Sequence, residues 1–270
     1  MNKKISIIIV NYNSRDFLYN CLRSIQENIT VDYEVIVVDN CSSDESVFKC
    51  REIFSDGRFI LINSGSNLGF AKANNIGAEC AKGGILHFLN PDTTLDKSMN
   101  EDYRKVVLNN DLLYVNPLIN RDGSYENDKM PLPLIKDLFF WNFNREKSRY
   151  WYKGASVIIS KDNFNLIGKW CEDYFLYAED LDLFYMAWTK GVRIAMLTSV
   201  IYHFGGGSSS TKWSDLEREV MVQRSNRLFY RKHFSNIHFL LVKLYFLLHN
   251  LLKHPSVVPQ YIKAWKLSGK

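Results

Sequence analysis

The sequence predicts an α/β protein with a mostly parallel central sheet, flanking helices and a helical extension at the C-terminal end. Short apolar runs rich in β-branched residues alternate with segments whose apolar residues recur at helical spacing. Strand–helix–strand units of this kind form right-handed crossovers, which place successive strands parallel in one sheet. With 270 residues, of which 46% are apolar, the chain can form one large or two small domains.

Four strands alternate with three helices in the N-terminal part of the chain. The strands are expected at residues 5–10, 33–38, 58–62 and 85–89. Ser14 can cap the first helix, and the second is expected to follow the capping box of Ser42 and Glu45. The third runs over residues 71–81 and ends at a pair of glycines. The fourth strand, ILHFL, has the apolar character of a strand buried on both faces.

Polar residues follow each of these strands. Because the carboxyl ends of parallel strands meet at the edge where open α/β sheets bind ligands, these residues should converge. Asn and Asp after strands are also ordinary turn formers, so each one alone is more readily explained as a turn. Four such turns together favour a nucleotide pocket. The residues concerned are Asn11, Asp39, residues 67–69 and residues 90–92.

Asp92 is the candidate metal ligand at this edge. It follows the central strand through Asn90 and Pro91, and a proline cannot continue a hydrogen-bonded ladder, so the carboxylate is fixed at the strand end. The sequence lacks both glycine-rich motifs that commonly hold phosphates. A divalent metal is the usual substitute, and Asp92 can bridge Mg²⁺ or Mn²⁺ to a diphosphate.

The middle of the chain is less regular. A surface helix is expected at residues 97–109, with strands at 112–119 and 151–160. Pro131 and Pro133 break any helix in this region. The aromatic segment 138–143, LFFWNF, is expected to be a loop. Beside a pocket this loop could stack on sugars or touch lipid, and it could equally pack under the sheet edge as core.

Three carboxylates begin a helix near residue 180. Glu179, Asp180 and Asp182 occupy its first turn, where the helix dipole favours negative charge by roughly 0.3–1 kcal/mol. That explanation leaves out the apolar run 174–178, which should carry the first two acids inward from solvent. A partly buried carboxylate at a pocket edge suits a general base.

His203 precedes a run of three glycines and three serines at residues 205–210. A lone histidine is more often structural than a ligand. The glycine and serine run is typical of a flexible segment that closes over a substrate and opens for product. We therefore interpret His203 as a second protein ligand of the metal and the following segment as a lid.

The charge distribution and the cysteine content limit the binding partners and the cellular compartment that can be expected. Residues 211–270 contain eleven Lys and Arg and three Asp and Glu, so the charge of this tail is +8. The net charge of the whole chain is +5, so residues 1–210 carry −3. No basic stripe accompanies a nucleic-acid motif, so binding to DNA or RNA is not expected. Five cysteines without a C-x-x-C pair indicate reduced thiols, and the first apolar run is too short for a signal peptide. A cytoplasmic location is expected.

The tail combines this charge with an apolar helix. Residues 238–252 are mostly apolar, but the run is shorter than the ~20 residues of a spanning helix and Lys243 interrupts it. With its flanking lysines and Trp265, the segment 236–266 fits an amphipathic helix on an anionic membrane surface. Packing on the domain, or on a second subunit in a homodimer, is the competing interpretation.

Seven blocks of sequence resemble the inverting family-two glycosyltransferases with the GT-A fold, and within them a rhamnosyltransferase-like subgroup of bacterial O-antigen and capsule synthesis. They occur in order over about residues 5–210. The blocks are VNYNS at 10–14, VVDNCSSDES at 37–46, NLGFAKANNIG at 67–77, FLNPD at 88–92, KGASVIISKDNF at 153–164, YFLYAEDLDL at 174–183 and HFGGGSS at 203–209.

The resemblance implies a division of the chain and a first group of site residues. A GT-A domain would occupy residues 1–210, with a nucleotide-sugar half at about 1–118 and an acceptor half at about 119–210, followed by the extension 211–270. Asp39 resembles the acid that contacts the base or ribose. Two further turns resemble nucleotide-contacting turns: Asn11, Tyr12 and Asn13, and Asn67 to Gly69.

The resemblance also implies the reacting groups. Asp92 matches the last acid of the D-x-D motif, and Asn90 and Pro91 replace its earlier positions, so metal binding would be shared with His203. Glu179 and Asp180 match the element that supplies the base, with Asp180 preferred. The acid would take the proton of an acceptor hydroxyl during a single displacement at the sugar C1, with inversion.

The implied reaction moves a sugar from a dTDP- or UDP-linked donor, with a rhamnose-like deoxyhexose favoured. The acceptor would be a glycan or an undecaprenyl-linked glycan of bacterial surface polysaccharide synthesis, on the inner face of the cytoplasmic membrane. One alternative is a transferase of the same fold that uses UDP-hexose or UDP-galactofuranose. A nucleotidyltransferase and a non-catalytic nucleotide-sugar-binding module are alternatives of other classes.

Overall fold

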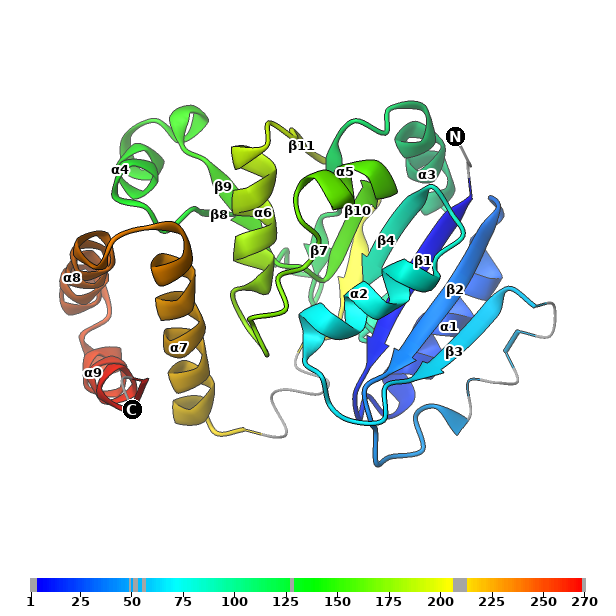
Figure 1. Cartoon of the computed structure of the whole chain (residues 1–270), viewed down its shortest axis with the longest axis horizontal. Helices are drawn as coiled ribbons and strands as arrows, with labels where there is room; N and C mark the ends of the chain where they lie inside the picture. The colour runs from blue at the N-terminus through cyan, green and yellow to red at the C-terminus, as the bar shows by residue number, and fades with distance from the viewer. Residues whose placement is uncertain are drawn as a thin grey trace.

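The computed structural model describes residues 4–48, 50, 53–54, 57–126, 129–205 and 213–268. Its centre is a seven-stranded sheet with the strand order β11-β6-β10-β4-β1-β2-β3 (Figure 1). In that order the strands are Ile194–Met196, Leu113–Val115, Ser156–Ser160, Ile85–Leu89, Ile5–Asn11, Tyr33–Asp39 and Phe59–Asn63. The pairs joining β4, β1, β2 and β3 are all parallel, so the predicted fold class is confirmed. Strand β4 lies in the middle of the sheet, as its apolar sequence predicted.

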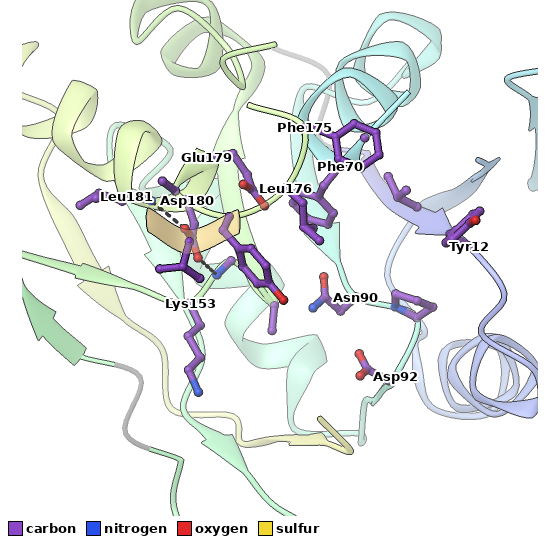
Figure 2. Close-up of a pocket in the computed structure, with 18 of the residues that line it drawn as sticks. Tyr12, Phe70, Asn90, Asp92, Lys153, Phe175, Leu176, Glu179, Asp180 and Leu181 are labelled. Atoms are coloured by element: carbon purple, nitrogen blue, oxygen red, sulfur yellow. Dashed lines mark hydrogen bonds between the residues drawn. The ribbon is translucent and has the colours of Figure 1, made fainter. Parts of the chain in front are cut away.

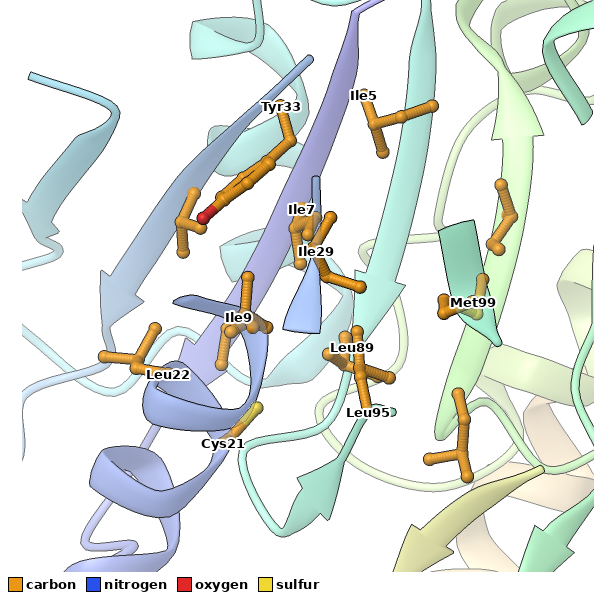
Figure 3. Packing of buried hydrophobic residues seen from close by; sticks show 14 of the residues in the cluster. Ile5, Ile7, Ile9, Cys21, Leu22, Ile29, Tyr33, Leu89, Leu95 and Met99 are labelled. Carbon is orange, nitrogen blue, oxygen red and sulfur yellow. The ribbon is translucent and has the colours of Figure 1, made fainter. Parts of the chain in front are cut away.

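The two faces of β1 build two separate cores. Ile5, Ile7 and Ile9 pack with helix α1 (Asp16–Asn28), as Figure 3 shows. Ile8 and Val10 pack with helix α2 (Phe70–Cys80) on the other face. Successive side chains of a strand point to opposite faces, so a strand between two helical layers must be apolar at nearly every position. Polar residues are therefore admitted mainly where such a strand ends.

The second half of the sheet contains a reversal. Strand β10 is antiparallel to both β4 and β6, and helices α3 (Met99–Leu108), α5 (Lys161–Leu166) and α6 (Glu179–Thr189) cover this half. The expected strand at 112–119 is two strands, β6 and β7 (Leu118–Ile119), in different sheets. Pro117 lies between them and has no N–H to continue a ladder. The expected strand at 151–160 is likewise divided, into β9 (Tyr150–Tyr152) and β10.

A small three-stranded sheet lies beyond the end of β4. Its order is β5 (Thr93–Thr94), β12 (Ile201–His203) and β7. Thr93 pairs with His203 in antiparallel register. This pairing brings residues that are more than a hundred positions apart in sequence to the same end of the central strand.

Three expectations for local structure are wrong. Ser14 does not cap α1, because its hydroxyl donates to Asn11 Oδ1. The helix expected after Ser42 and Glu45 is not an α-helix: the described residues of 41–54 form turns, with 3-10 helical backbone at Phe48 and Cys50. The Ser42 hydroxyl accepts the Asn13 N–H at 3.0 Å, so it holds the loop against the end of β1 and does not cap a helix. The aromatic segment expected as a loop is helix α4 (Ile135–Phe143), which buries Leu138 and exposes Phe139 and Phe143.

Three helices form the C-terminal extension, at the end of the molecule away from β3 (Figure 1). They are α7 (Asp215–His233), α8 (Asn236–Lys253) and α9 (Val258–Ser268). Phe229, Tyr230 and Val242 join Leu138 and Leu181 in a third apolar cluster, which attaches the extension to α4 and α6. Within the described ranges, each helix is too short or too polar to cross a bilayer.

Candidate active site

A cavity of about 490 Å³ opens at the carboxyl ends of β1 and β4, where the sequence predicts a site (Figure 2). Asn90 and Asp92 border it at the end of β4, and Glu179 and Asp180 lie across from them at the start of α6. Nine of the predicted residues line this cavity. They are Tyr12, Asn67, Gly69, Asn90, Pro91, Asp92, Glu179, Asp180 and His203.

Three predicted residues, Asn11, Asn13 and Asp39, are not among the residues that line the cavity. Asn11 is fully buried, and its Nδ2 donates to Asp39 Oδ1 at 2.9 Å and also approaches Ser42 Oγ at 3.0 Å. Asn13 Oδ1 accepts the backbone N–H of Ser43 at 2.7 Å. These side chains hold the loop after β2 against the end of β1, and they lie behind the residues that line the cavity.

Asn40 lines the cavity in place of its neighbour Asp39, and the sequence reasoning missed it. Its Nδ2 donates to Asn67 Oδ1 at 2.9 Å, and its Oδ1 accepts the Leu68 N–H at 2.8 Å. One amide side chain therefore joins the loops after β2 and β3. Its place directly after the second strand was the sequence signal that could have identified it. Successive side chains of a strand point to opposite sides, so one of the two consecutive polar residues Asp39 and Asn40 should face the cavity.

Gly69 permits a very close approach between two cavity loops. Its φ is +83°, and a Cβ at this position would lie 2.4 Å from the backbone oxygen of Phe175. The N–H of Phe70 donates to that same oxygen at 3.2 Å. A side chain at residue 69 would displace the segment that leads into α6, so glycine is required by space as well as by φ.

The acids at the start of α6 are held in an unusual backbone. Tyr177 and Ala178 have φ of 68° and 64°, in the left-handed region that residues with a Cβ rarely adopt. Such strain is stored where surrounding contacts over-determine it, frequently at functional sites. Here it turns the chain so that the next two residues, Glu179 and Asp180, line the cavity.

Glu179 and Asp180 differ in how they are paired. Asp180 accepts the Leu181 N–H at 2.8 Å and the Gly154 N–H at 3.3 Å (Figure 2). Glu179 is buried, and its Oε2 has no hydrogen-bond partner. Burial raises the pKa of both carboxyls, and for Glu179 the negative charge of Asp180 adds to the rise. A pair of this kind holds one carboxylate ready to accept a proton near neutral pH.

The third acid of the same turn has a structural contact. Asp182 Oδ1 accepts the Tyr174 hydroxyl at 3.1 Å and pairs with His233 Nε2 from α7. It is buried and does not line the cavity. Asp182 therefore ties the extension to α6, whereas its two neighbours remain available to the cavity.

A row of four ionisable side chains lies on the side of Asp92. His203 Nε2 is 3.4 Å from Asp92 Oδ1, and His203 Nδ1 is 2.8 Å from Glu126 Oε2. Lys153 Nζ pairs with Glu126 Oε1. Burial acts to lower the pKa of His203, but hydrogen bonds and charge from Asp92 and Glu126 outweigh it and raise that pKa. Burial opposes ionisation of Glu126 too, yet Lys153 and His203 lower its pKa.

The donor atoms around Asp92 fit a divalent cation that is shared with a ligand. A carboxylate and an imidazole nitrogen face each other there, and the nearby Oδ1 of Asn90 is buried without a hydrogen-bond partner. Over the residues described, no group of three or more His, Cys, Asp or Glu side chains could hold a metal. Mg²⁺ and Mn²⁺ commonly take the rest of their ligands from substrate phosphates and water, so two protein ligands suffice for such a site.

Residues 6–168 match the family model described as glycosyl transferase family 2, and they make up more than half of the chain. The chain belongs to this family. Among curated relatives of this family 2 chain, the low-salt glycan biosynthesis hexosyltransferase Agl10 of Haloferax volcanii is 28% identical over 205 residues, covering 70% of this chain and 63% of that protein. An uncharacterized glycosyltransferase of Bacillus subtilis, YwdF, is 27% identical over 205 residues and covers 74% of each chain. The family 2 chain thus spans less than two thirds of the Haloferax protein.

Solved structures share the fold of the family 2 chain. S. aureus TarS in complex with UDP-GlcNAc superposes with a TM-score of 0.60 at 18% identity, over 97% of this chain and 79% of that one. GalNAc-T7 with UDP, GalNAc and Mn²⁺ gives 0.61 at 17% identity, over 82% of this chain and 47% of that one. At these identities the likeness is one of fold, and it confirms the GT-A architecture expected from the sequence.

Proposed function

We propose that this family 2 chain is an inverting glycosyltransferase that moves a sugar from a nucleoside-diphosphate donor to an acceptor hydroxyl. One observation carries the proposal. A paired acid with raised pKa, Asp180, lines the same cavity as Asp92 and His203, which face each other on its other side. Family membership and glycosyltransferase relatives give independent support.

The proposed reaction is a single displacement at the sugar C1. The carboxylate of Asp180 takes the proton of the acceptor hydroxyl, the acceptor oxygen forms its bond to C1, and the bond from C1 to the diphosphate oxygen breaks with its electron pair on the leaving group. The raised pKa of Asp180 makes it a better proton acceptor than an exposed aspartate. Asp92 and His203 would hold Mg²⁺ or Mn²⁺, which supplies positive charge to the leaving diphosphate.

The donor is proposed to be UDP- or dTDP-linked, with a rhamnose-like deoxyhexose preferred and a UDP-hexose or UDP-galactofuranose as the alternative. The UDP and UDP-GlcNAc bound to the two structural neighbours favour a UDP sugar. Residues after three strands border the nucleotide end: Tyr12, Asn40 and Asn67. One hydroxyl or methylene changes preference by only about 1–3 kcal/mol in an apolar pocket, so an assay has to choose among these sugars.

The acceptor is proposed to be a glycan or an undecaprenyl-linked glycan of surface polysaccharide synthesis. Trp213, Val222 and Asn226 of the extension line the same cavity as Asp180, so α7 borders the path to the base. Teichoic acid poly(glycerol phosphate) polymerase of Staphylococcus epidermidis is among the relatives, over 34% of this chain. A lipid-linked acceptor fits a cavity wall that is continuous with a helical extension rich in exposed leucines.

The extension is proposed to bind the anionic inner face of the cytoplasmic membrane through the segment 236–266. Seven apolar side chains of α8 are exposed: Ile237, Leu240, Leu241, Leu244, Leu248, Leu251 and Leu252. Residues 220–270 contain nine Lys and Arg and no Asp or Glu. An exposed apolar row within a segment that lacks acids suits anionic lipid, and a second copy of the chain is the competing occupant.

The deciding experiment measures the product released from a panel of dTDP-, UDP- and GDP-sugars. A glycosyltransferase releases nucleoside diphosphate, whereas a nucleotidyltransferase releases or consumes pyrophosphate. With the active donor, Asp180→Asn is expected to lower turnover by about 10²–10⁴-fold while nucleotide binding persists. Asp173→Asn, an exposed acid in the preceding loop, is the matched control. Turnover of Asp180→Asn at the wild-type rate would refute the base, and binding without turnover by the wild type would leave a binding module.

A further inference from the structure

The row of charged groups beside the cavity extends past the two expected metal ligands, to Glu126 and Lys153. We propose that Glu126 is a positioning residue, which orients the His203 imidazole so that its Nε2 faces Asp92 and can bind the divalent ion of the donor. The proposal rests on the proposed function only in requiring that nucleotide and metal bind together. Neither Glu126 nor Lys153 stands out in the sequence as a site residue.

Hydrogen-bond chemistry fixes the proton on the imidazole nitrogen that faces Glu126. An ionised carboxylate can only accept a hydrogen bond, so the 2.8 Å contact requires His203 Nδ1 to donate to Glu126. The other nitrogen, Nε2, is the one that lies 3.4 Å from Asp92 Oδ1. Carboxylates placed in this way behind metal-binding histidines fix both the tautomer and the ring orientation, and their loss typically weakens metal binding about 10–100-fold.

Backbone hydrogen bonds hold Asp92, His203 and Glu126 in or beside the small three-stranded sheet. His203 pairs with Thr93, and the Phe204 N–H donates to the Asp92 oxygen at 2.8 Å. Strand β7 pairs with β12, and the Glu126 N–H donates to the oxygen of Leu118 in β7 at 3.0 Å. Hydrogen bonds therefore set the backbone positions of Asp92, His203 and Glu126. The side-chain torsions of His203 are not set by the backbone, and its hydrogen bond to Glu126 fixes them.

Lys153 connects this row to the base. Its ammonium pairs with the partly buried carboxylate of Glu126. The next residue, Gly154, donates its N–H to Asp180 Oδ2 at 3.3 Å. Two consecutive residues thus support both sides of the cavity, so a change at Lys153 would disturb donor and base together. Glu126 is the cleaner position for a test.

The test titrates Mn²⁺ into the full chain with UDP present and follows free Mn²⁺ by electron paramagnetic resonance. Glu126→Gln and Glu126→Ala are each expected to weaken Mn²⁺ binding about 10–100-fold. In a His203→Ala background, Glu126→Gln should cause no further loss, because its effect acts through the imidazole. Wild-type Mn²⁺ affinity in Glu126→Gln would overturn the proposal, and so would an equal loss with and without His203.

Two further measurements separate positioning from folding. Asp137→Asn removes a buried acid that pairs with Arg149 outside the cavity, so it should lower the melting temperature and leave Mn²⁺ affinity unchanged. In the wild type with Mg²⁺ and UDP, ¹⁵N chemical shifts of His203 should report protonation at Nδ1, and protonation at Nε2 would contradict the proposal. If the wild type binds neither UDP nor Mn²⁺, the proposed function fails, whereas unchanged affinity in Glu126→Gln alone refutes only this inference.

Discussion

Glu179 is the residue whose burial costs the fold most clearly. Its Oε2 is buried without a partner beside a second acid, and burial with charge repulsion raises its pKa. An acid whose pKa is higher in the folded chain binds its proton more tightly there. The free energy of unfolding therefore falls as pH rises from the unfolded pKa, about 4.3, toward the folded pKa, and stays lower above it.

Replacing this acid with its amide should remove that penalty. Glu179→Gln is expected to match wild-type stability near pH 3.5, below the unfolded pKa, and to exceed it by more than about 1 kcal/mol near pH 9. Urea unfolding at the two pH values measures the difference. Glu101→Gln, at an exposed position on α3, is the matched control. An equal effect of Glu179→Gln at both values would mean that this carboxylate is not the source of the penalty.

The residues that line the cavity were predictable where one strand end sufficed to place them. Asp92, Asn90 and Tyr12 line the cavity because β4 and β1 deliver them directly. Asp39 and Asn11 were expected beside them, but they bind each other across neighbouring strands. That pairing depends on the register that aligns them, which a single sequence does not contain. Asn40 could have been found from its place directly after β2, whereas Glu126 is placed by its contacts with His203 and Lys153, which are distant in sequence.

Helix α6 was predicted accurately from the sequence, but the backbone of the segment that leads into it was not. Its acidic first turn and its end near Lys190 follow from the sequence. The left-handed Tyr177 and Ala178 do not, because residues with a Cβ carry no sequence signal for this conformation. The helix expected after Ser42 failed for a related reason, since its serines bind to Asn11 from another strand. In the segment after Ser42, local propensity lost to tertiary hydrogen bonds.

The contact between Gly69 and the loop before α6 gives an element-scale prediction. Gly69→Ala would place a Cβ 2.4 Å from the Phe175 oxygen, so either α2 or the loop must shift. We expect unfolding free energy to fall by about 1–3 kcal/mol, as for other overpacked positions, and donor KM to rise. Urea unfolding and initial rates provide the two measurements.

A matched variant separates crowding from backbone strain. Gly65 has a similar φ of +73°, but nothing lies within 4 Å of the position that a Cβ would take. Gly65→Ala therefore reports the cost of the left-handed φ alone. Equal losses in the two variants would show that the approach of Phe175 contributes nothing, and a larger loss in Gly69→Ala supports the contact.

At the scale of the whole molecule, chemistry and charge are segregated. The acids of the cavity belong to residues 1–219, which carry a net charge of −4 and contain every Asp and Glu of the chain. Residues 220–270, which include the rest of α7 with α8 and α9, carry +9 together with the exposed leucines of α8. Such a molecule would be oriented by an anionic surface, with the extension toward the lipid and the sheet directed away from it.

The exposed row of α8 is the place to test this orientation. Replacing Leu241, Leu244 and Leu248 with Ser should abolish sedimentation of the protein with vesicles of phosphatidylcholine and phosphatidylglycerol, because the apolar contact and the lysines must act together. Leu108→Ser with Leu166→Ser removes two exposed leucines from α3 and α5 and should leave vesicle binding intact. If the triple variant still binds vesicles, α8 is not the membrane surface. If the wild type does not bind vesicles but sediments as a dimer, and the triple variant sediments as a monomer, a second copy of the chain covers the leucines.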